Sequence, residues 1–229
     1  MTTAFARLFD DAAMFPPGNA PVDVAVKAHL GRDSDLVGPL VCDLARVPAV
    51  IAEATEPLGI AVVGRVEDVV PALGLVAGSP VSVASAEILG PVRALAGLPV
   101  RPVAVEMPWG DGLGVPDDAV LKLRCGGDHV PTVDELAAAI RHCVEHDQPF
   151  KLTAGLHAAI AHDGAHGFVN VMAAVVAAMR GDDPAPVLTA AADRLDLASL
   201  GESRRLLRSI GTCDLDEPLA GLRGLGLIA

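Results

Sequence analysis

The chain has 229 residues, of which 52% are apolar, and it carries a formal net charge of -12 at pH 7. This size and apolar content suffice for a full hydrophobic core, and no linker interrupts the chain, so we expect one domain over residues 1–229. The negative charge argues against sequence-independent binding to nucleic acid or to an anionic membrane, which relies on clustered Lys and Arg. A small anionic substrate stays compatible, because a local pocket can be positive on a negative protein.

The compartment is suggested by what the sequence lacks. Residues 1–11 contain no apolar run of signal-peptide length, and the apolar stretch 169–179 is far too short to cross a bilayer. The chain contains four widely spaced cysteines: Cys42, Cys125, Cys143 and Cys213. They form no C-x-x-C pair, which argues against a zinc knuckle and against a disulfide scaffold. We therefore expect a cytoplasmic protein. The sequence does not determine an oligomeric state, and a homo-oligomer is compatible with it.

Short apolar runs alternate with stretches of helical periodicity along the chain. The predicted strands lie near Leu8 and Phe9 and at residues 36–42, 59–63, 80–86, 101–107, 119–125, 150–153 and 209–214. The predicted helices cover residues 22–30, 44–54, a segment opening at 67–68, 89–98, 132–146, 168–179, 186–194 and 217–225. Thr132 and Glu135 form the pattern of a capping box. Two loops, 108–116 and 155–167, are too polar and glycine-rich to be core.

Eight buried strands alternating with helices predict a parallel sheet covered by helices. In this length they fit a compact (β/α)8 TIM barrel, with a doubly wound open parallel sheet as the alternative. The sequence contains no G-x-G-x-x-G after a strand and no G-x-x-x-x-G-K-[ST]. Nucleotide-binding templates are therefore unsupported, and no cofactor is expected.

Two consecutive predicted strands each carry a lysine, Lys122 and Lys151, where an apolar strand has little reason to hold a charge. Strand alternation places Arg124 on the same face as Lys122, and Thr153 on the same face as Lys151. If these faces point into the barrel, the cations converge beside Glu106 and share a location at the barrel mouth.

Three interpretations of the lysine pair remain open. An amine whose pKa is lowered by a second cation can attack a carbonyl and form a Schiff base, and the cations can alternatively hold an anionic substrate. The third interpretation is a buried ion pair with Glu106 or Glu87. His157, two residues beyond Gly155, is expected at the site mouth as a proton shuttle or substrate contact.

Four segments resemble deoxyribose-phosphate aldolase and its relatives, class I aldolases on a (β/α)8 barrel. L-F-D-D-A-A-M-F-P-P at 8–17 resembles the opening L-I-D-H-T-x-L-x-P motif of that family, and K-L-R-C-G at 122–126 has the spacing of its K-T-S-T-G segment. K-L-T-A-G at 151–155 resembles K-A-S-G-G, and S-I-G-T-C at 209–213 is similar to the terminal I-G-T-S turn. Arg124, Cys125 and Cys213 depart from these motifs and favour a different substrate.

The resemblance implies a lyase that acts on a small carbonyl substrate. Lys122 would be the Schiff-base nucleophile and Lys151 the cation that lowers its pKa, while Asp10 and Glu106 would handle protons. The expected substrate contacts are Arg124, Thr153, Gly155, His157, Gly211, Thr212 and Cys213.

Two other classes of function stay open. One is a metal-dependent hydrolase or isomerase with Asp43, Glu87, Glu106 and His157 as ligands and the lysines as an anion pocket. No local spacing demands such a metal site. The other is a barrel that binds a small anion without catalysis, since this architecture hosts many chemistries.

Overall fold

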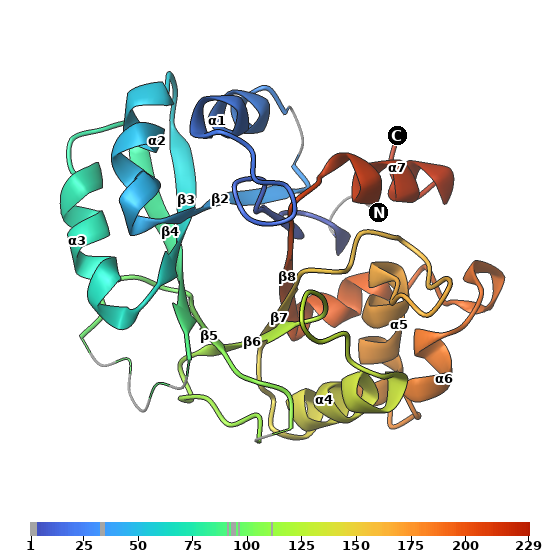
Figure 1. The fold of residues 1–229 in the computed structure, drawn as a ribbon. Helices are drawn as coiled ribbons and strands as arrows, with labels where there is room; N and C mark the ends of the chain where they lie inside the picture. Colours follow the sequence, from blue (N-terminus) through green and yellow to red (C-terminus); the bar gives the residue numbers. More distant parts are fainter. Residues whose placement is uncertain (1–3, 33–34, 91, 93–94, 96, 111) are drawn as a thin grey trace.

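The structure is a computed structural model that describes residues 4–32, 35–90, 92, 95, 97–110 and 112–229. The described residues form a closed barrel in which each strand pairs in parallel with the next and β8 returns to pair with β1 (Figure 1). The strands are β1 Phe9–Asp11, β2 Val37–Asp43, β3 Leu58–Gly64, β4 Val81–Leu89, β5 Val103–Glu106, β6 Val120–Arg124, β7 Phe150–Thr153 and β8 Leu207–Thr212. This closure confirms the predicted (β/α)8 TIM barrel and excludes the open sheet.

The helices lie outside the ring of strands (Figure 1). They are α1 Val22–Leu30, α2 Val47–Glu53, α3 Val66–Val76, α4 Val133–Glu145, α5 Phe168–Met179, α6 Ala185–Leu188 and α7 Asp216–Gly224. Short 3-10 helices cover Leu44–Arg46, Ala192–Arg194 and Leu200–Arg205. None of the helices in the described part of the chain has the length and apolarity that a membrane span requires.

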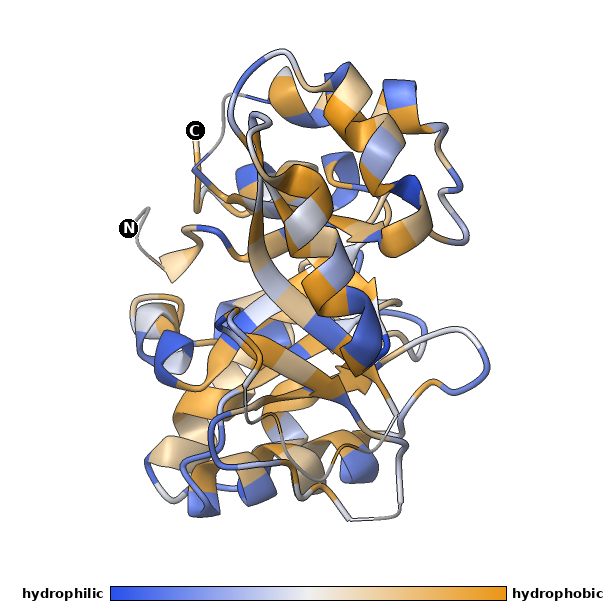
Figure 2. Ribbon diagram, turned by 90° about the vertical axis from the view of Figure 1, so that its left-hand side faces the viewer, coloured by the Kyte–Doolittle hydropathy of each residue, from blue (hydrophilic) through white to orange (hydrophobic). Residues whose placement is uncertain are grey.

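The core lies between the strands and the helices. Figure 2 shows predominantly apolar strands, whereas most helices carry both hydrophilic and hydrophobic residues. Helix α5 is the exception, because it is apolar along nearly its whole length and packs against α4, α6 and the 3-10 helix Leu200–Arg205. An amphipathic helix needs one apolar stripe, so an all-apolar helix is stable only with protein on several sides.

The predicted capping box is confirmed at the start of α4. The Thr132 hydroxyl oxygen accepts a hydrogen bond from the Glu135 N–H at 3.2 Å, and the Glu135 carboxylate accepts one from the Thr132 N–H at 2.7 Å. These reciprocal bonds satisfy two donors that an uncapped helix leaves free.

Two of the predicted helices need correction. Leu89 ends strand β4 and does not begin a helix, and part of the expected helix 89–98 lies outside the described residues. The expected helix 186–194 is the short α6 followed by the 3-10 helix Ala192–Arg194. At its break the segment contacts another helix, because the Asn170 side chain of α5 donates hydrogen bonds to the carbonyls of Val187 and Ala190 at 2.9 and 2.8 Å. Both carbonyls therefore have a hydrogen-bond donor without a further helical turn.

Candidate functional site

The barrel interior contains a chain of alternating charges contributed by β1, β7, β4, β6 and β5. In spatial order its members are Asp10, Lys151, Glu87, Lys122 and Glu106. The first four side chains are almost entirely shielded from solvent, each at most 5% exposed. We call this set the interior charge chain. Its members come from segments separated by up to 141 residues, so barrel closure is what brings them together.

Lys122 lies between two carboxylates. Its Nζ is 2.7 Å from Glu87 Oε2 and 2.9 Å from Glu106 Oε2. The register of β5 and β6 places Glu106 directly beside Lys122, whereas Glu87 reaches it from β4 across the barrel interior. The predicted convergence of Lys122 and Glu106 is confirmed by this geometry.

Lys151 has a different pair of partners. Its Nζ donates hydrogen bonds to Asp10 Oδ2 and to Glu87 Oε1, both at 2.5 Å. Asp10 also accepts a hydrogen bond from the Ser209 hydroxyl at 2.6 Å. One carboxylate, Glu87, therefore bridges the two lysines, and Asp10 does not contact Lys122.

The buried ion pairs keep the carboxylate of Glu87 and the ammonium of Lys151 in their charged forms. Burial disfavours ionisation of Glu87, but the attraction of Lys122 and Lys151 outweighs it and lowers the pKa of Glu87 from 4.5 to about 2. Burial likewise disfavours the ammonium of Lys151, yet Asp10 and Glu87 outweigh it and raise the pKa of Lys151 above its usual 10.5. Lys151 therefore remains an ammonium at neutral pH.

Two cavities border the lysines of the interior charge chain, and Glu106 lines a third one. The cavity at the C-terminal ends of the strands, which we call the mouth cavity, has a volume of about 600 Å³ and is lined by Lys122, Arg124 and Thr153. The other, at the N-terminal ends, measures about 300 Å³ and is lined by Lys151 and Asp10. Glu87 lines both, so the charge chain forms the wall between them.

The expectation that both lysines share the mouth is therefore wrong. Lys122 and Lys151 are register partners on β6 and β7, but each lines a different cavity. Barrel strands tilt relative to the barrel axis, so partners at the same register step differ in height along it. Strand alternation assigned each lysine to one face of its strand, and the structure shows that this is the interior face in both strands.

Arg124 lies at the end of β6 on the rim of the mouth cavity. Its Nη1 is 4.0 Å from Glu106 Oε1, and its side chain is half exposed. The Trp109 indole N–H donates a hydrogen bond to the Arg124 carbonyl at 2.5 Å, which ties the 107–119 connection to this rim. Arg124 is thus a cation available to an anionic group that enters the mouth.

Thr153, Gly155 and Gly211 all line the mouth cavity, as expected for substrate contacts. Close packing also explains why both of these positions are glycines. A Cβ at Gly211 would lie 2.7 Å from Thr153 Oγ1, and a Cβ at Gly155 would lie 2.3 Å from the Cys125 carbonyl oxygen. Gly155 in addition has a φ of +71°, which L side chains rarely adopt.

His157 reaches the mouth cavity from the loop after β7, as predicted. Its Nδ1 lies 3.1 Å from Glu217 Oε2, and its Nε2 lies 3.9 Å from the Cys213 sulfur. Cys213 also lines the cavity, and burial, aided by the charges of Asp214 and Glu217, raises the pKa of its thiol against opposing backbone hydrogen bonds. The thiol is therefore predominantly protonated at neutral pH.

Thr212, an expected substrate contact, does not itself line the mouth cavity, although its hydroxyl lies 3.5 Å from Nδ1 of His157, which does. Its side chain is buried and is absent from the described lining of the cavity. Its hydroxyl donates a hydrogen bond to the Asp214 carbonyl at 2.7 Å, which shapes the turn between β8 and α7.

The four residues considered as metal ligands are engaged elsewhere. Asp43 caps the 3-10 helix Leu44–Arg46 and forms an ion pair with Arg46, while His157 faces Glu217. Glu87 and Glu106 face the lysines. Within the described ranges, no three His, Cys, Asp or Glu side chains are grouped as a metal would require.

The sequence suggested Glu87 as an ion-pair partner of the lysines, which the structure confirms, but its bridging of both lysines was not predicted, and neither was the contact of Ser209 with Asp10. Strand β4 continues two residues past Glu87, to Leu89, so Glu87 lies inside the barrel and not at its rim. An acid between Ala86 and Ile88, both buried, is the signal in β4 that could have revealed its interior position. Ser209 has no such signal, because a serine near a strand start is ordinary.

No protein-family model matches the chain, and no curated protein sequence is significantly similar to it.

Proposed function

We propose that this protein is a Schiff-base-forming enzyme, a lyase of class I aldolase type that acts on a small carbonyl substrate. Lys122 is its nucleophile. The observation that carries the proposal is a buried lysine amine facing the mouth cavity with two carboxylates within 3 Å, Glu87 at 2.7 Å and Glu106 at 2.9 Å.

The cost of the interior charge chain supports a functional role. Barrel interiors are ordinarily filled by branched apolar side chains. Removing ions from water costs several kcal/mol each, and well-packed apolar replacements are often neutral or stabilising. Stability alone therefore gives no reason to keep five charges inside this barrel. Perturbed ionisable groups beside a cavity are typical of active sites.

Glu106 suits the role of proton acceptor for Lys122. It is the more exposed of the two carboxylates, with 18% of its side chain accessible compared with 4% for Glu87, so it can exchange protons with solvent. Transfer of one proton from the ammonium to Glu106 frees the Nζ lone pair to attack a carbonyl carbon. In the adduct, one amine proton moves to the carbonyl oxygen and Glu106 returns its proton to the same oxygen, which leaves as water and gives a protonated imine.

The carboxylates of Glu87 and Glu106 would also stabilise the positively charged imine intermediate. A protonated imine on Lys122 carries the same single positive charge as the ammonium it replaces, so Glu87 and Glu106 stabilise it without rearrangement. The imine can take up the electron pair released when the neighbouring carbon–carbon bond breaks. Preorganised charges of this kind need no reorientation during the reaction.

Lys151 acts as a positioning residue in this proposal. It stays charged because Asp10 and Glu87 raise its pKa, so it does not compete as a nucleophile. Its ammonium offsets half of the negative charge that Glu87 and Glu106 direct at Lys122. Asp10 and Ser209 hold it in place. Arg124, Thr153 and His157 line the cavity where the rest of a substrate would lie.

Borohydride trapping tests the proposal sharply, because the chain has only three lysines, Lys27, Lys122 and Lys151. We expect incubation with small aldehydes and 2-oxoacids, followed by reduction, to add one substrate mass to the protein. Lys122→Met should abolish the adduct. Lys27→Met, which changes an exposed helix residue, is the matched control and should retain it. An adduct that survives Lys122→Met, or none with any carbonyl compound, would refute the proposal.

A further inference from the structure

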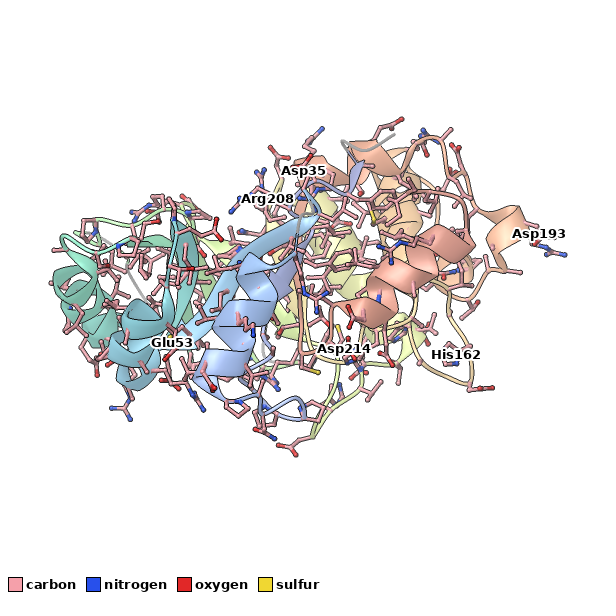
Figure 3. All side chains as sticks on the ribbon, turned by 90° about the horizontal axis from the view of Figure 1, so that it is seen from above. Asp35, Glu53, His162, Asp193, Arg208 and Asp214 are labelled. Atoms are coloured by element: carbon pink, nitrogen blue, oxygen red, sulfur yellow. The ribbon has the colours of Figure 1, made fainter. Side chains whose placement is uncertain are left out.

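The cavity at the N-terminal end of the barrel is lined at its outer side by three arginines, Arg7, Arg204 and Arg208. In Figure 3, Arg208 lies at the end of the molecule opposite Asp214 and His162, which belong to the loops around the mouth. The inner side of the cavity is formed by Asp10, Glu87 and Lys151, which are already paired with one another.

Arg204 is the most constrained of the three arginines. It lies on the 3-10 helix Leu200–Arg205, and its Nη2 donates a hydrogen bond to the Ala6 carbonyl at 3.2 Å. Its Nη1 is buried and has no hydrogen-bond partner among the described residues. An unsatisfied buried donor on a charged group is costly, and the free energy is recovered only when an acceptor fills the site.

The charges around Arg204 also indicate that its guanidinium lacks an anionic partner. Burial and the neighbouring charge of Arg208 lower the pKa of Arg204, while Asp10 acts in the opposite direction. In the part of the chain that the structure describes, none of the three arginines forms an ion pair with a carboxylate within 4.0 Å. By contrast, the adjacent Arg205 pairs with Asp147 at 2.7 Å. Three such arginines around one cavity are notable in a protein of net charge -12.

We infer that this cavity is a binding site for a phosphate-type oxyanion, either free phosphate or the phosphate group of a small ester, at the end of the barrel opposite the mouth. Guanidinium groups match such anions because their donors are arranged in a fixed fork. The cavity volume of about 300 Å³ admits one small anion. The inference does not depend on the chemistry of Lys122.

Isothermal titration at constant ionic strength tests the site, with inorganic phosphate in one arm and glycerol phosphate in the other. Wild-type protein is expected to bind at least one of them saturably with one site per chain. Arg204→Met should weaken binding about ten- to a hundredfold, as expected for a lost charge-assisted hydrogen bond. Arg208→Met, which alters an exposed side chain and is not expected to perturb folding, should weaken it in the same direction.

Two control variants make the titration decisive. Arg205→Met removes a neighbouring arginine that pairs with Asp147, and Arg124→Met removes the cation at the mouth. Both should bind like the wild type. Tighter binding of phosphate identifies the free anion as the ligand, and tighter binding of the ester identifies a phosphorylated metabolite. No saturable binding of either compound, or equal loss in Arg124→Met, would overturn the inference.

Discussion

Glu87 is the residue on which the barrel interior depends, because both lysines use its carboxylate. Glu87→Gln removes the charge that Lys122 and Lys151 share while keeping the shape of the side chain. Breaking a buried ion pair by removing one partner costs about 3–5 kcal/mol. We therefore predict a loss of about this size in the free energy of unfolding, measured by urea denaturation at pH 7.

The matched control is Asp183→Asn, which breaks an exposed ion pair with Arg141. Its effect should be much smaller, because water already solvates both partners. The double variant Glu87→Gln with Lys151→Met should lose less than the two single variants combined, since it leaves fewer unpaired charges. Equal effects of Glu87→Gln and Asp183→Asn would contradict the account of the interior charge chain.

Asn170 fastens several elements together through one buried side chain. Its Oδ1 accepts a hydrogen bond from the Ala161 N–H at 2.9 Å, in the loop after β7. Its Nδ2 donates hydrogen bonds to the carbonyls of Val187 and Ala190 at the end of α6. Leaving such buried groups unsatisfied costs about 1–3 kcal/mol each. We predict that Asn170→Leu destabilises the protein by several kcal/mol in urea denaturation.

A control at the same segment distinguishes this role from general sensitivity of α6. Thr189→Ala removes an exposed hydroxyl whose contact with the Pro186 carbonyl is 3.4 Å long. It should leave the midpoint of denaturation nearly unchanged. If Asn170→Leu also leaves it unchanged, the three hydrogen bonds are not needed to hold the loop and α6.

Elements with strong local patterns were predictable from the sequence. The helices Val22–Leu30 and Phe168–Met179 and the strand Phe150–Thr153 have the predicted bounds, because periodicity and their flanking residues are local properties. The short α6 was not predictable in the same way. At its break it accepts hydrogen bonds from Asn170, an amide supplied by another helix.

For the candidate site, too, local sequence patterns predicted only part of what the structure shows. Alternation along β6 and β7 indicated which residues share a face with Lys122 and with Lys151, but not that these faces point into the barrel. Their assignment to different cavities, and the bridging role of Glu87, depend on barrel tilt and on β4, which no local pattern encodes. Sequence reasoning therefore identified the charged residues better than their partners.

The interior charge chain should set the pH range over which the whole molecule is stable. The pKa of Glu87 is lowered to about 2, so its contribution is full above its usual 4.5 and is lost as the pH falls toward 2. The pKa of Lys151 is raised above 10.5, so its contribution is full below 10.5 and is lost as the pH rises through the folded-state pKa. We predict a stability plateau between these limits.

Urea denaturation at a series of pH values measures this plateau. Glu87→Gln should flatten the loss on the acid side, because that side then lacks its main titrating group. An unchanged acid profile in Glu87→Gln would show that other carboxylates dominate acid unfolding.

We propose that Lys122, and neither Lys151 nor Lys27, is the amine that reacts with carbonyl compounds. The most direct test is peptide mapping of the wild-type protein after borohydride trapping, with the adduct quantified at each of the three lysines. Lys151 is held as an ammonium and lines the other cavity, and Lys27 is exposed on helix α1. We predict that the adduct is found on the peptide containing Lys122. An adduct concentrated on Lys151, or spread evenly over the three lysines, would contradict it.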